Sequence, residues 1–492
     1  MINRFKNSHK YKWEFCIEKG RVNFMYSAKN NANNEQINTR LLVLEMLLSV
    51  TKPSQNGQCE YSHVVVREVL NKYNYLSQQE KAFIKRLFEG TLERMIELDY
   101  VINLFSNVKV NKMKPVIRTI MRMGVYQILY MDAIPDAAAC NEAVKLAQKK
   151  GFSTLKGFVN GVLRNIARNK EGIEYPSLAI TYSMPEWITD IWIEQLGDKT
   201  TEKVLKGLLA EHPVTIRFRN ADIIKTDLEA VEAVIKNQGG IIEKHPYLDY
   251  AYRIYKTDDI TRLPGFKEGA FVIQDVSSML AVEAVLTNIQ NENIKVLDVC
   301  AAPGGKSMLA ADLLEKKGVK HYSIEARDIS ENKVQLMSEN FERCRLNNAK
   351  AVVWDATETD DAFLEQADIV IADIPCSGLG IMGKKRDIKY KMTPESIKEI
   401  EKLQKQILKT AVKYLKAGGR LLFSTCTINA KENEENFEWI KNELGLKPVS
   451  LDKALFGNIS NDLHSDTIEK GYIQLLPGIH DTDGFFISVF EK

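Results

Sequence analysis

The alternation of short apolar runs with helical segments in the C-terminal half most constrains the fold of this 492-residue chain. From about residue 271, the apolar runs fall at 295–299, 321–324, 351–353, 369–372, 420–424 and 485–490. Strands that alternate with helices form a mostly parallel sheet with helices on both faces. Ligands of such sheets bind outside the carboxyl ends of the strands. Residues 271–492 are therefore expected to form an α/β Rossmann-like domain with its site at that edge.

The first third of the chain shows only helical periodicity. Residues 37, 41, 44 and 48 are apolar and form one stripe at i, i+4, i+7 and i+11. Further helices are expected at 61–72, 78–106, 113–131, 138–149 and 152–168, separated by proline, glycine or polar stretches. This pattern predicts an all-α domain over residues 36–170. Residues 1–34 are polar and lack periodicity, so we expect a mobile extension there.

A small α+β module is predicted between these two parts. Residues 171–185 have the character of a linker. Helices are then expected at 186–197, 199–210 and 226–237, and an alternating strand at 214–219. Together, residues 186–270 form the predicted middle module. Trp187 and Trp192 lie in its first helix, where a place in the core is the more usual role than stacking on a nucleic-acid base.

Charge and cysteine content limit the classes of function. Residues 1–170 hold 27 Lys and Arg against 14 Asp and Glu, whereas the remainder holds 40 against 51. A basic first third suits a nucleic-acid partner, but also a solvated basic domain without one. The seven cysteines are scattered, with no CxxC pair or Cys/His cluster, which favours a reducing cytoplasm and argues against disulfides and a metal site. No long apolar run or signal peptide predicts a membrane segment or export.

A Gly-rich turn after the first apolar run is the candidate cofactor site. It comprises Cys300, Ala301, Ala302, Pro303, Gly304, Gly305 and Lys306. Glycines let the backbone approach a ligand, and the helix that follows has an electropositive N-terminus. A P-loop is excluded because a cysteine stands five residues before Gly305, where that motif needs glycine, and a dinucleotide GxGxxG is absent. S-adenosylmethionine is a nucleotide-sized ligand that fits this turn.

Acidic residues follow the next two strands. Asp328 is the candidate for the ribose diol of the cofactor, with Glu325 as the alternative, and Asp355 is the candidate for the adenine edge. Any one of these acids alone would more often cap a helix. Their succession at strand ends after a Gly-rich turn favours cofactor binding.

Cys376 and Cys426 follow apolar strands at the expected ligand edge, within DIPCSG and STCT. A buried, inert thiol is the usual role of cysteine, and we expect it for the cysteines at 16, 59, 140 and 344. At the ligand edge, a thiolate can instead add to ring carbon 6 of a cytosine and make ring carbon 5 nucleophilic. A carboxyl group such as Asp373 can hydrogen-bond ring nitrogen 3 during this attack. A second thiol can assist release of the product.

The motifs resemble those of the RsmB (Sun, or Fmu) family of bacterial 16S rRNA cytosine-5 methyltransferases. The likeness spans roughly residues 36–492, strongest in VLDVCAAPGGKS at 296–307, DIPCSGLG at 373–380 and STCTINAKENEENF at 424–437. FVIQDVSSML at 271–280 and DGFFISVF at 483–490 also match. The resemblance implies that Cys426 is the nucleophile and Cys376 assists release. It also implies cofactor contacts from 300–306, Asp328, Asp355 and Asp373, with Lys306 at the boundary between cofactor and substrate.

The all-α segment resembles a NusB-like RNA-binding domain, through MRMGVYQILYMDAIPDAAACNEAV at 121–144 and FVNGVLRNI at 158–166. These resemblances imply a cytoplasmic, monomeric enzyme that acts on a single-stranded or loop region of 16S rRNA, without membrane or metal. Two alternatives stay open. One is the same chemistry on tRNA, and the other is a non-catalytic RNA-binding or antitermination-type factor.

Overall fold

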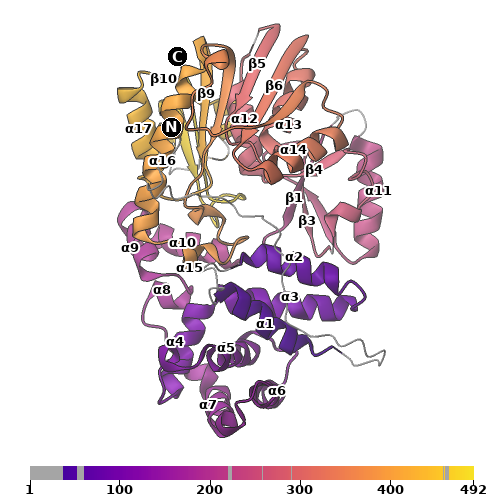
Figure 1. The fold of residues 1–492 in the computed structure, drawn as a ribbon, viewed down its shortest axis with the longest axis vertical. Helices are drawn as coiled ribbons and strands as arrows, with labels where there is room; N and C mark the ends of the chain where they lie inside the picture. The colour runs from indigo at the N-terminus through magenta and orange to yellow at the C-terminus, as the bar shows by residue number, and fades with distance from the viewer. Residues whose placement is uncertain are drawn as a thin grey trace, which may run out of the picture.

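The computed structural model describes residues 37–51, 60–219, 224–257, 259–289, 291–457, 459 and 465–492. In Figure 1 a helical domain occupies the lower part, a domain with a large sheet the upper part, and a small α+β module one side. The predicted multidomain fold class, with helical, small α+β and Rossmann-like parts in that order, is confirmed. The extension predicted for residues 1–34 lies outside the described residues.

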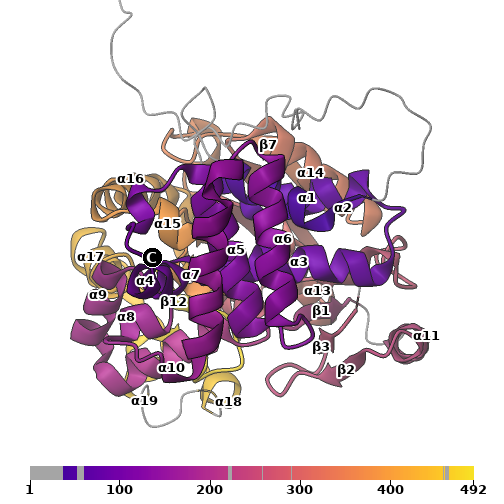
Figure 2. The ribbon, with the colours of Figure 1, turned by 90° about the horizontal axis from the view of Figure 1, so that it is seen from below.

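The helical domain buries the apolar stripe that the sequence predicts. Its helices are α1 (Thr39–Thr51), α2 (Ser62–Lys72), α3 (Gln78–Glu93), α4 (Met95–Phe105), α5 (Pro115–Tyr130), α6 (Asp136–Lys149) and α7 (Lys156–Asn169). Leu41 and Leu44 are buried in the same core as the inner faces of α3, α5 and α7. Figure 2 looks onto α5, α6 and α7 from below.

The prediction of a single helix over residues 78–106 is wrong. The chain breaks at Arg94, whose φ of −103° and ψ of 17° lie outside helical geometry, so α3 and α4 are separate helices. The Arg94 guanidinium bonds the buried Glu97 at 2.7 Å and the Tyr130 hydroxyl at 3.1 Å. Tertiary bonds of this kind override a helical pattern that the sequence shows as continuous.

The middle part contains a four-stranded antiparallel sheet of order β2-β3-β1-β4. Its elements are α8 (Leu178–Thr181), α9 (Glu186–Leu196), α10 (Asp198–Leu209), β1 (Val214–Phe218), α11 (Ile224–Asn237), β2 (Ile241–Lys244), β3 (Ala251–Tyr255) and β4 (Phe271–Ile273). Of the strands, the sequence predicted only β1. β4 pairs with β1 although it follows residue 270, the predicted module end. The predicted domain boundaries stay predictions.

Trp192 is a core residue. It is fully buried, and its indole nitrogen donates to the carbonyl of Ile428 at 2.7 Å, so it is not available for stacking on a base. Trp187 packs partly buried against the same cluster. This cluster joins α9 and α10 to loops of the large-sheet domain, including Leu379 and Leu476. These two helices therefore support the site described below.

The large sheet has the order β10-β12-β9-β8-β5-β6-β7, with β11 paired to β12. Its strands are β5 (Asn293–Asp298), β6 (His321–Asp328), β7 (Ala349–Val353), β8 (Ala367–Asp373), β9 (Leu415–Thr425), β10 (Lys447–Pro448), β11 (Tyr472–Leu475) and β12 (Phe485–Glu491). The strands β7, β6, β5, β8 and β9 run parallel, and β12 is antiparallel to β9. The six predicted strands are present, whereas β10 and β11 were missed.

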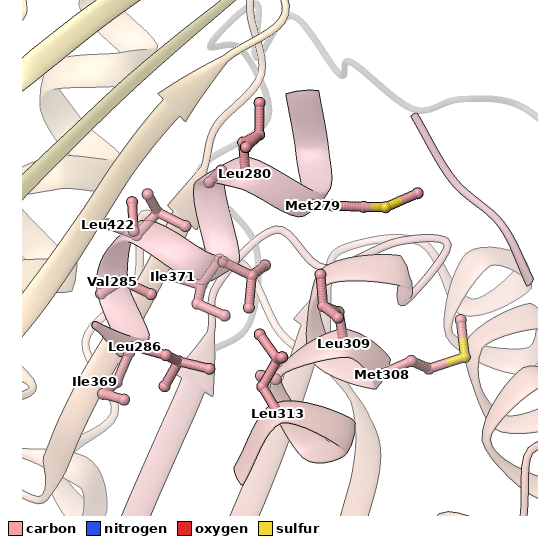
Figure 3. Packing of buried hydrophobic residues seen from close by; sticks show 14 of the residues in the cluster. Met279, Leu280, Val285, Leu286, Met308, Leu309, Leu313, Ile369, Ile371 and Leu422 are labelled. Carbon is pink, nitrogen blue, oxygen red and sulfur yellow. The ribbon is translucent and has the colours of Figure 1, made fainter. Parts of the chain in front are cut away.

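Helices cover both faces of this sheet, as the apolar strands require. They are α12 (Val276–Leu286), α13 (Gly305–Lys316), α14 (Glu331–Arg343), α16 (Pro394–Lys413), α17 (Glu434–Glu443), α18 (Lys453–Phe456) and α19 (Ser465–Lys470). The short helix α15 (Ile388–Lys391) lies away from the sheet, against the helical domain. Successive strand residues point to opposite sides. Ile371 and Leu422 pack under α12 and α13 (Figure 3), whereas Ala372 and Phe423 pack against α16 and α17. The sheet is thereby a rigid base for the loops at its carboxyl edge.

A segment of the large-sheet domain, residues 384–392, docks on the helical domain. Asp387 accepts hydrogen bonds from the backbone N–H and hydroxyl of Ser62 at 3.2 and 2.6 Å. The ammonium of Lys389, which is buried, donates to the carbonyl of Glu93 at 2.6 Å. We call residues 384–392 the docking segment.

No helix within the described ranges is long and apolar enough to cross a lipid bilayer.

Candidate active site

The Gly-rich turn joins β5 to α13 at the carboxyl edge of the sheet. Gly304 adopts a left-handed φ of 97°, which a side chain disfavours, and α13 begins at Gly305. The backbone N–H of Ala301 donates to the carbonyl of Arg327 at 2.8 Å, which ties the turn to β6. The Ala302–Pro303 peptide bond is cis. The turn thus presents the N-terminus of α13 toward the sheet edge, as the sequence predicts for a nucleotide-sized ligand.

Asp298, at the end of β5, is fully buried under this turn. One carboxylate oxygen accepts from the Ser307 hydroxyl at 2.7 Å, and the other is buried without a hydrogen-bond partner. Burial raises the pKa of Asp298 to about 7. Burial and then the charges of Asp298, Asp328 and Asp373 raise the pKa of Cys300. Carboxylates from three strand ends therefore converge on the turn.

The two candidates for the ribose position differ in what holds them. Asp328 ends β6, and its carboxylate accepts from the Ser330 N–H at 3.1 Å and the Lys333 ammonium at 3.2 Å. Glu325 lies three residues earlier in the same strand. One of its oxygens pairs with Arg327 at 2.6 Å and the other with Lys350 at 2.6 Å. Asp328 stands at the carboxyl end of β6, the edge where ligands of such sheets bind, whereas Glu325 lies within the strand.

Asp355 follows β7 and closes its own turn. It accepts from the N–H and the hydroxyl of Thr357 at 2.9 and 2.7 Å. No hydrogen bond or ion pair among the described residues joins its side chain to the Gly-rich turn or to Asp328. This geometry is that of a turn-capping acid. Asp328 caps its own turn in the same way, through the N–H of Ser330, so this bond does not rank the two acids as cofactor ligands.

Lys306 and Asp373 form an ion pair between the first turn of α13 and the end of β8. The Lys306 ammonium lies 2.5 Å from one Asp373 oxygen, and the Ser424 hydroxyl donates to the other at 2.9 Å. The parallel pairing of β8 with β9 sets Asp373 beside Ser424. Two predicted site residues, 67 positions apart, are thereby in direct contact.

Cys376 and Cys426 face each other across the ends of the same two strands. Their Sγ atoms are 3.3 Å apart, and both residues are half-buried. The hydrogen bond with Cys426, then burial, raises the pKa of Cys376 well above that of an ordinary thiol. Both cysteines are free thiols. The fold therefore brings the two predicted reactive thiols into one site.

A buried polar network beneath the thiols was missed by the sequence analysis. Its centre is Glu432, which is fully buried and accepts from the N–H and hydroxyl of Ser377, from Asn429 and from Gln404. Asn433 bonds the Thr427 carbonyl at 3.1 Å. Glu432 and Asn433 stand in the stretch KENEEN, which has the composition of an exposed helix start. The quoted STCTINAKENEENF motif contained them, but gave them no role.

The remaining cysteines agree with the expectation of inert thiols where they are described. Cys140 and Cys344 are buried, and burial raises the pKa of Cys140. Cys16 and Cys59 lie outside the described residues. In the parts of the chain that the structure covers, no group of His, Cys, Asp and Glu side chains is arranged to hold a metal ion.

Comparisons with known proteins show which family this chain belongs to. The family model described as 16S rRNA methyltransferase RsmB/F matches residues 284–491, and the NusB family model matches residues 37–168. A probable ribosomal RNA small subunit methyltransferase B of Bacillus subtilis is 34% identical over 93% of this chain and 99% of its own length. The chain belongs to the RsmB family. A probable RsmB of Synechocystis is 30% identical over 89% of this chain and 96% of its own length.

Solved structures share the fold of this RsmB-family chain. The crystal structure of PH0851 superposes with a TM-score of 0.72, covering 94% of this chain and all of the other, at 22% identity. NSun6 from Pyrococcus horikoshii, crystallised with SFG, superposes with a TM-score of 0.53 over 63% of this chain and 98% of its own, also at 22% identity. At these identities the likeness concerns the fold.

Proposed function

We propose that this chain methylates ring carbon 5 of a cytosine in 16S rRNA. The observation that carries the proposal is the pair of thiols, with Sγ atoms 3.3 Å apart, at the ends of β8 and β9. Methyl transfer to an exocyclic amine has no use for two adjacent thiols. Transfer to carbon 5 uses one thiolate to activate the ring and a second group to release the product.

Each residue of the site then has a role. Cys426 adds to ring carbon 6, and electron density moves to carbon 5, which accepts the methyl group. Loss of the carbon 5 proton to a base and breakage of the bond between carbon 6 and Cys426 then restore the ring, and Cys376 assists this release. Asp373, held by Lys306 and Ser424, is a hydrogen-bond acceptor in this ion pair. Donation to ring nitrogen 3 therefore requires that Asp373 take up a proton, or that Lys306, the cation of the same pair, act as the donor.

The residues present fit S-adenosylmethionine as the methyl donor. When bound, it supplies an electrophilic methyl group. The turn at 300–306 offers the backbone and the N-terminus of α13, and Asp328 offers a carboxylate at the neighbouring strand end for the ribose. Asp355 is retained as the candidate for the adenine edge. SFG, found with NSun6 of the same fold, is an analogue of this cofactor.

Ribosomal RNA is the favoured substrate because the chain belongs to the RsmB family and carries a NusB-family domain. A stacked cytosine cannot reach Cys426, so the target base leaves its stack, which a single-stranded or loop region allows most easily. We propose a monomeric cytoplasmic enzyme. The same chemistry on tRNA is the alternative substrate. A non-catalytic RNA-binding factor is disfavoured because the two thiols are present and contact each other, and Lys306 and Asp373 are present as an ion pair.

Bisulfite sequencing of rRNA and tRNA, from cells with and without this gene, tests reaction and substrate together. Loss of one protected cytosine in 16S rRNA is the expected result. Loss of a protected tRNA cytosine instead would keep the chemistry and replace the substrate. No change in either RNA would contradict cytosine-5 methylation.

The division of labour between the thiols is tested with single substitutions. Cys376→Ala is expected to accumulate a covalent protein–RNA adduct, since attack by Cys426 survives and release fails. The adduct migrates slowly on a denaturing gel. Adding Cys426→Ala to the same chain should remove it, and Cys140→Ala, in the helical domain, is the control that forms none. An adduct that persists without Cys426 would show that another group is the nucleophile.

A further inference from the structure

Glu432 joins the two loops that carry the thiols. It is fully buried just before α17, and one carboxylate oxygen accepts from the N–H of Ser377 at 2.8 Å while the other accepts from the Ser377 hydroxyl. Asn429 and Gln404 donate to it at 2.9 and 3.2 Å. Burial raises the pKa of Glu432, and hydrogen bonds from Ser377, Asn429 and Gln404 act in the opposite direction. Four donors on two oxygens match an ionised carboxylate, which can only accept.

The contacts of Glu432 reach the residue next to each thiol. Ser377 directly follows Cys376, and Thr427 directly follows Cys426. The hydroxyls of Ser377 and Thr427 lie 2.7 Å apart, and that of Thr427 is 3.5 Å from the same carboxylate. A chain of hydroxyls ending at Glu432 therefore fixes the separation of the two loops one residue away from the thiol pair.

The charges around Cys376 are not balanced. The titratable groups that face it are Cys426 from the end of β9, Glu432 from the loop before α17, and Asp373 from the end of β8. Asp373 is neutralised by Lys306 at 2.5 Å. Glu432 has no ion-pair partner among the described residues. Its charge opposes a second negative charge on Cys376, and the low dielectric of a buried site strengthens that effect.

We propose that Glu432 is a positioning residue that fixes the thiol pair and keeps Cys376 protonated, so that Cys376 donates its S–H to Cys426 and Cys426 is the thiol that ionises. The inference rests on the proposed function in so far as Cys426 is the nucleophile. It adds the reason why two similar thiols take different roles: the buried carboxylate lies behind the loop of Cys376.

Alkylation of the free enzyme tests the order of ionisation without RNA or cofactor. Full-length wild-type protein is treated with iodoacetamide across a pH series, and each cysteine is quantified by mass spectrometry. A thiolate displaces iodide to form a thioether, so the rate reports the thiolate fraction. Cys426 is expected to react at lower pH than Cys376. The reverse order would overturn the proposal, and this measurement needs no variant.

Glu432→Gln removes the charge and keeps the size of the side chain. If the charge holds the Cys376 proton, alkylation of Cys376 at pH 7.5 should rise about tenfold, the effect of one pKa unit. Glu435→Gln, an exposed carboxyl in the same segment, is the matched control and should change nothing. Circular dichroism checks that each variant is folded. A folded Glu432→Gln protein with unchanged Cys376 reactivity would refute the role of the charge.

Ser377→Ala separates charge from geometry. It removes the hydroxyl link but leaves the carboxylate, so Cys376 should stay unreactive toward iodoacetamide. A rise as large as that of Glu432→Gln would assign the effect to loop geometry and overturn the charge argument. Because the alkylation order is measured on free enzyme, it can fail while Cys426 still proves to be the nucleophile. Methylation by Cys426→Ala would instead refute Cys426 as the nucleophile and leave the measured order of ionisation unchanged.

Discussion

Removal of the Asp312 carboxylate is expected to destabilise the enzyme strongly, because of where its partners lie. Asp312, on α13, pairs with Arg217 and with Arg219, the latter at 2.7 Å. The three side chains are 8%, 1% and 14% exposed, respectively. Asp312→Asn leaves two guanidinium groups buried without their carboxylate. Breaking a buried pair from one side costs about 3–5 kcal/mol, because the remaining charge stays out of water.

Urea unfolding followed by tryptophan fluorescence measures this cost. None of the five tryptophans lies between residues 37 and 170, so fluorescence reports mainly on the sheet domains. The matched control is Glu292→Gln, which breaks the Lys320–Glu292 pair at 3.1 Å, whose side chains are 67% and 70% exposed. Exposed pairs contribute about 0–1 kcal/mol, so the control should unfold close to wild type.

The stability losses of the two variants together show whether burial sets the contribution of the ion cluster. If Asp312→Asn unfolds within about 1 kcal/mol of wild type, burial of the ion cluster does not set its contribution, and the reasoning is refuted. If both variants lose several kcal/mol, the effect of charge is general, and the cluster has no special role. The expected result also shows that this cluster links the small sheet to α13, the helix that begins at the Gly-rich turn.

Two further predictions concern the turn and the thiol loops. Gly380→Ala should abolish methylation, because the new Cβ would lie 2.0 Å from the carbonyl oxygen of Gly484. A radiolabel assay of methyl transfer to RNA measures this loss. Gly157→Ala, at an open helical position, is the control and should leave methyl transfer unchanged. Burial raises the pKa of Asp298 to about 7, so the folded state holds an extra proton between roughly pH 4 and 7. Stability from this group is present at low pH and falls as pH rises through that window. Asp298→Asn should flatten the fall in a series of urea midpoints, and an unchanged slope would exclude Asp298 as its source.

The sequence predicted the sheet domain well because its signals are local. Fully apolar runs mark strands buried on both faces, and the glycines mark the turn after β5. The sequence predicted that Cys376 and Cys426 lie at the same edge of the sheet, but their direct contact depends on β8 and β9 being neighbours, which only the structure shows. Glu432 could not be predicted, since burial of a carboxylate in a Glu- and Asn-rich stretch depends on tertiary partners. The sequence analysis also missed the exposed edge strand β2 (Ile241–Lys244) and the helix break at Arg94, because both depend on tertiary partners.

The docking segment makes the large-sheet domain depend on specific contacts with the helical domain. Burial lowers the pKa of Lys389 to about 7, and its ammonium is held by carbonyls of Glu93 and Ser183, from the helical domain and the connection that follows it. Tyr390 packs on the helical core. The same stretch of chain leaves the loop of Cys376 a few residues earlier. A helical domain grafted from a relative would therefore have to bring compatible carbonyls, and exchange of domains among such enzymes is constrained at a position that looks like an ordinary basic loop.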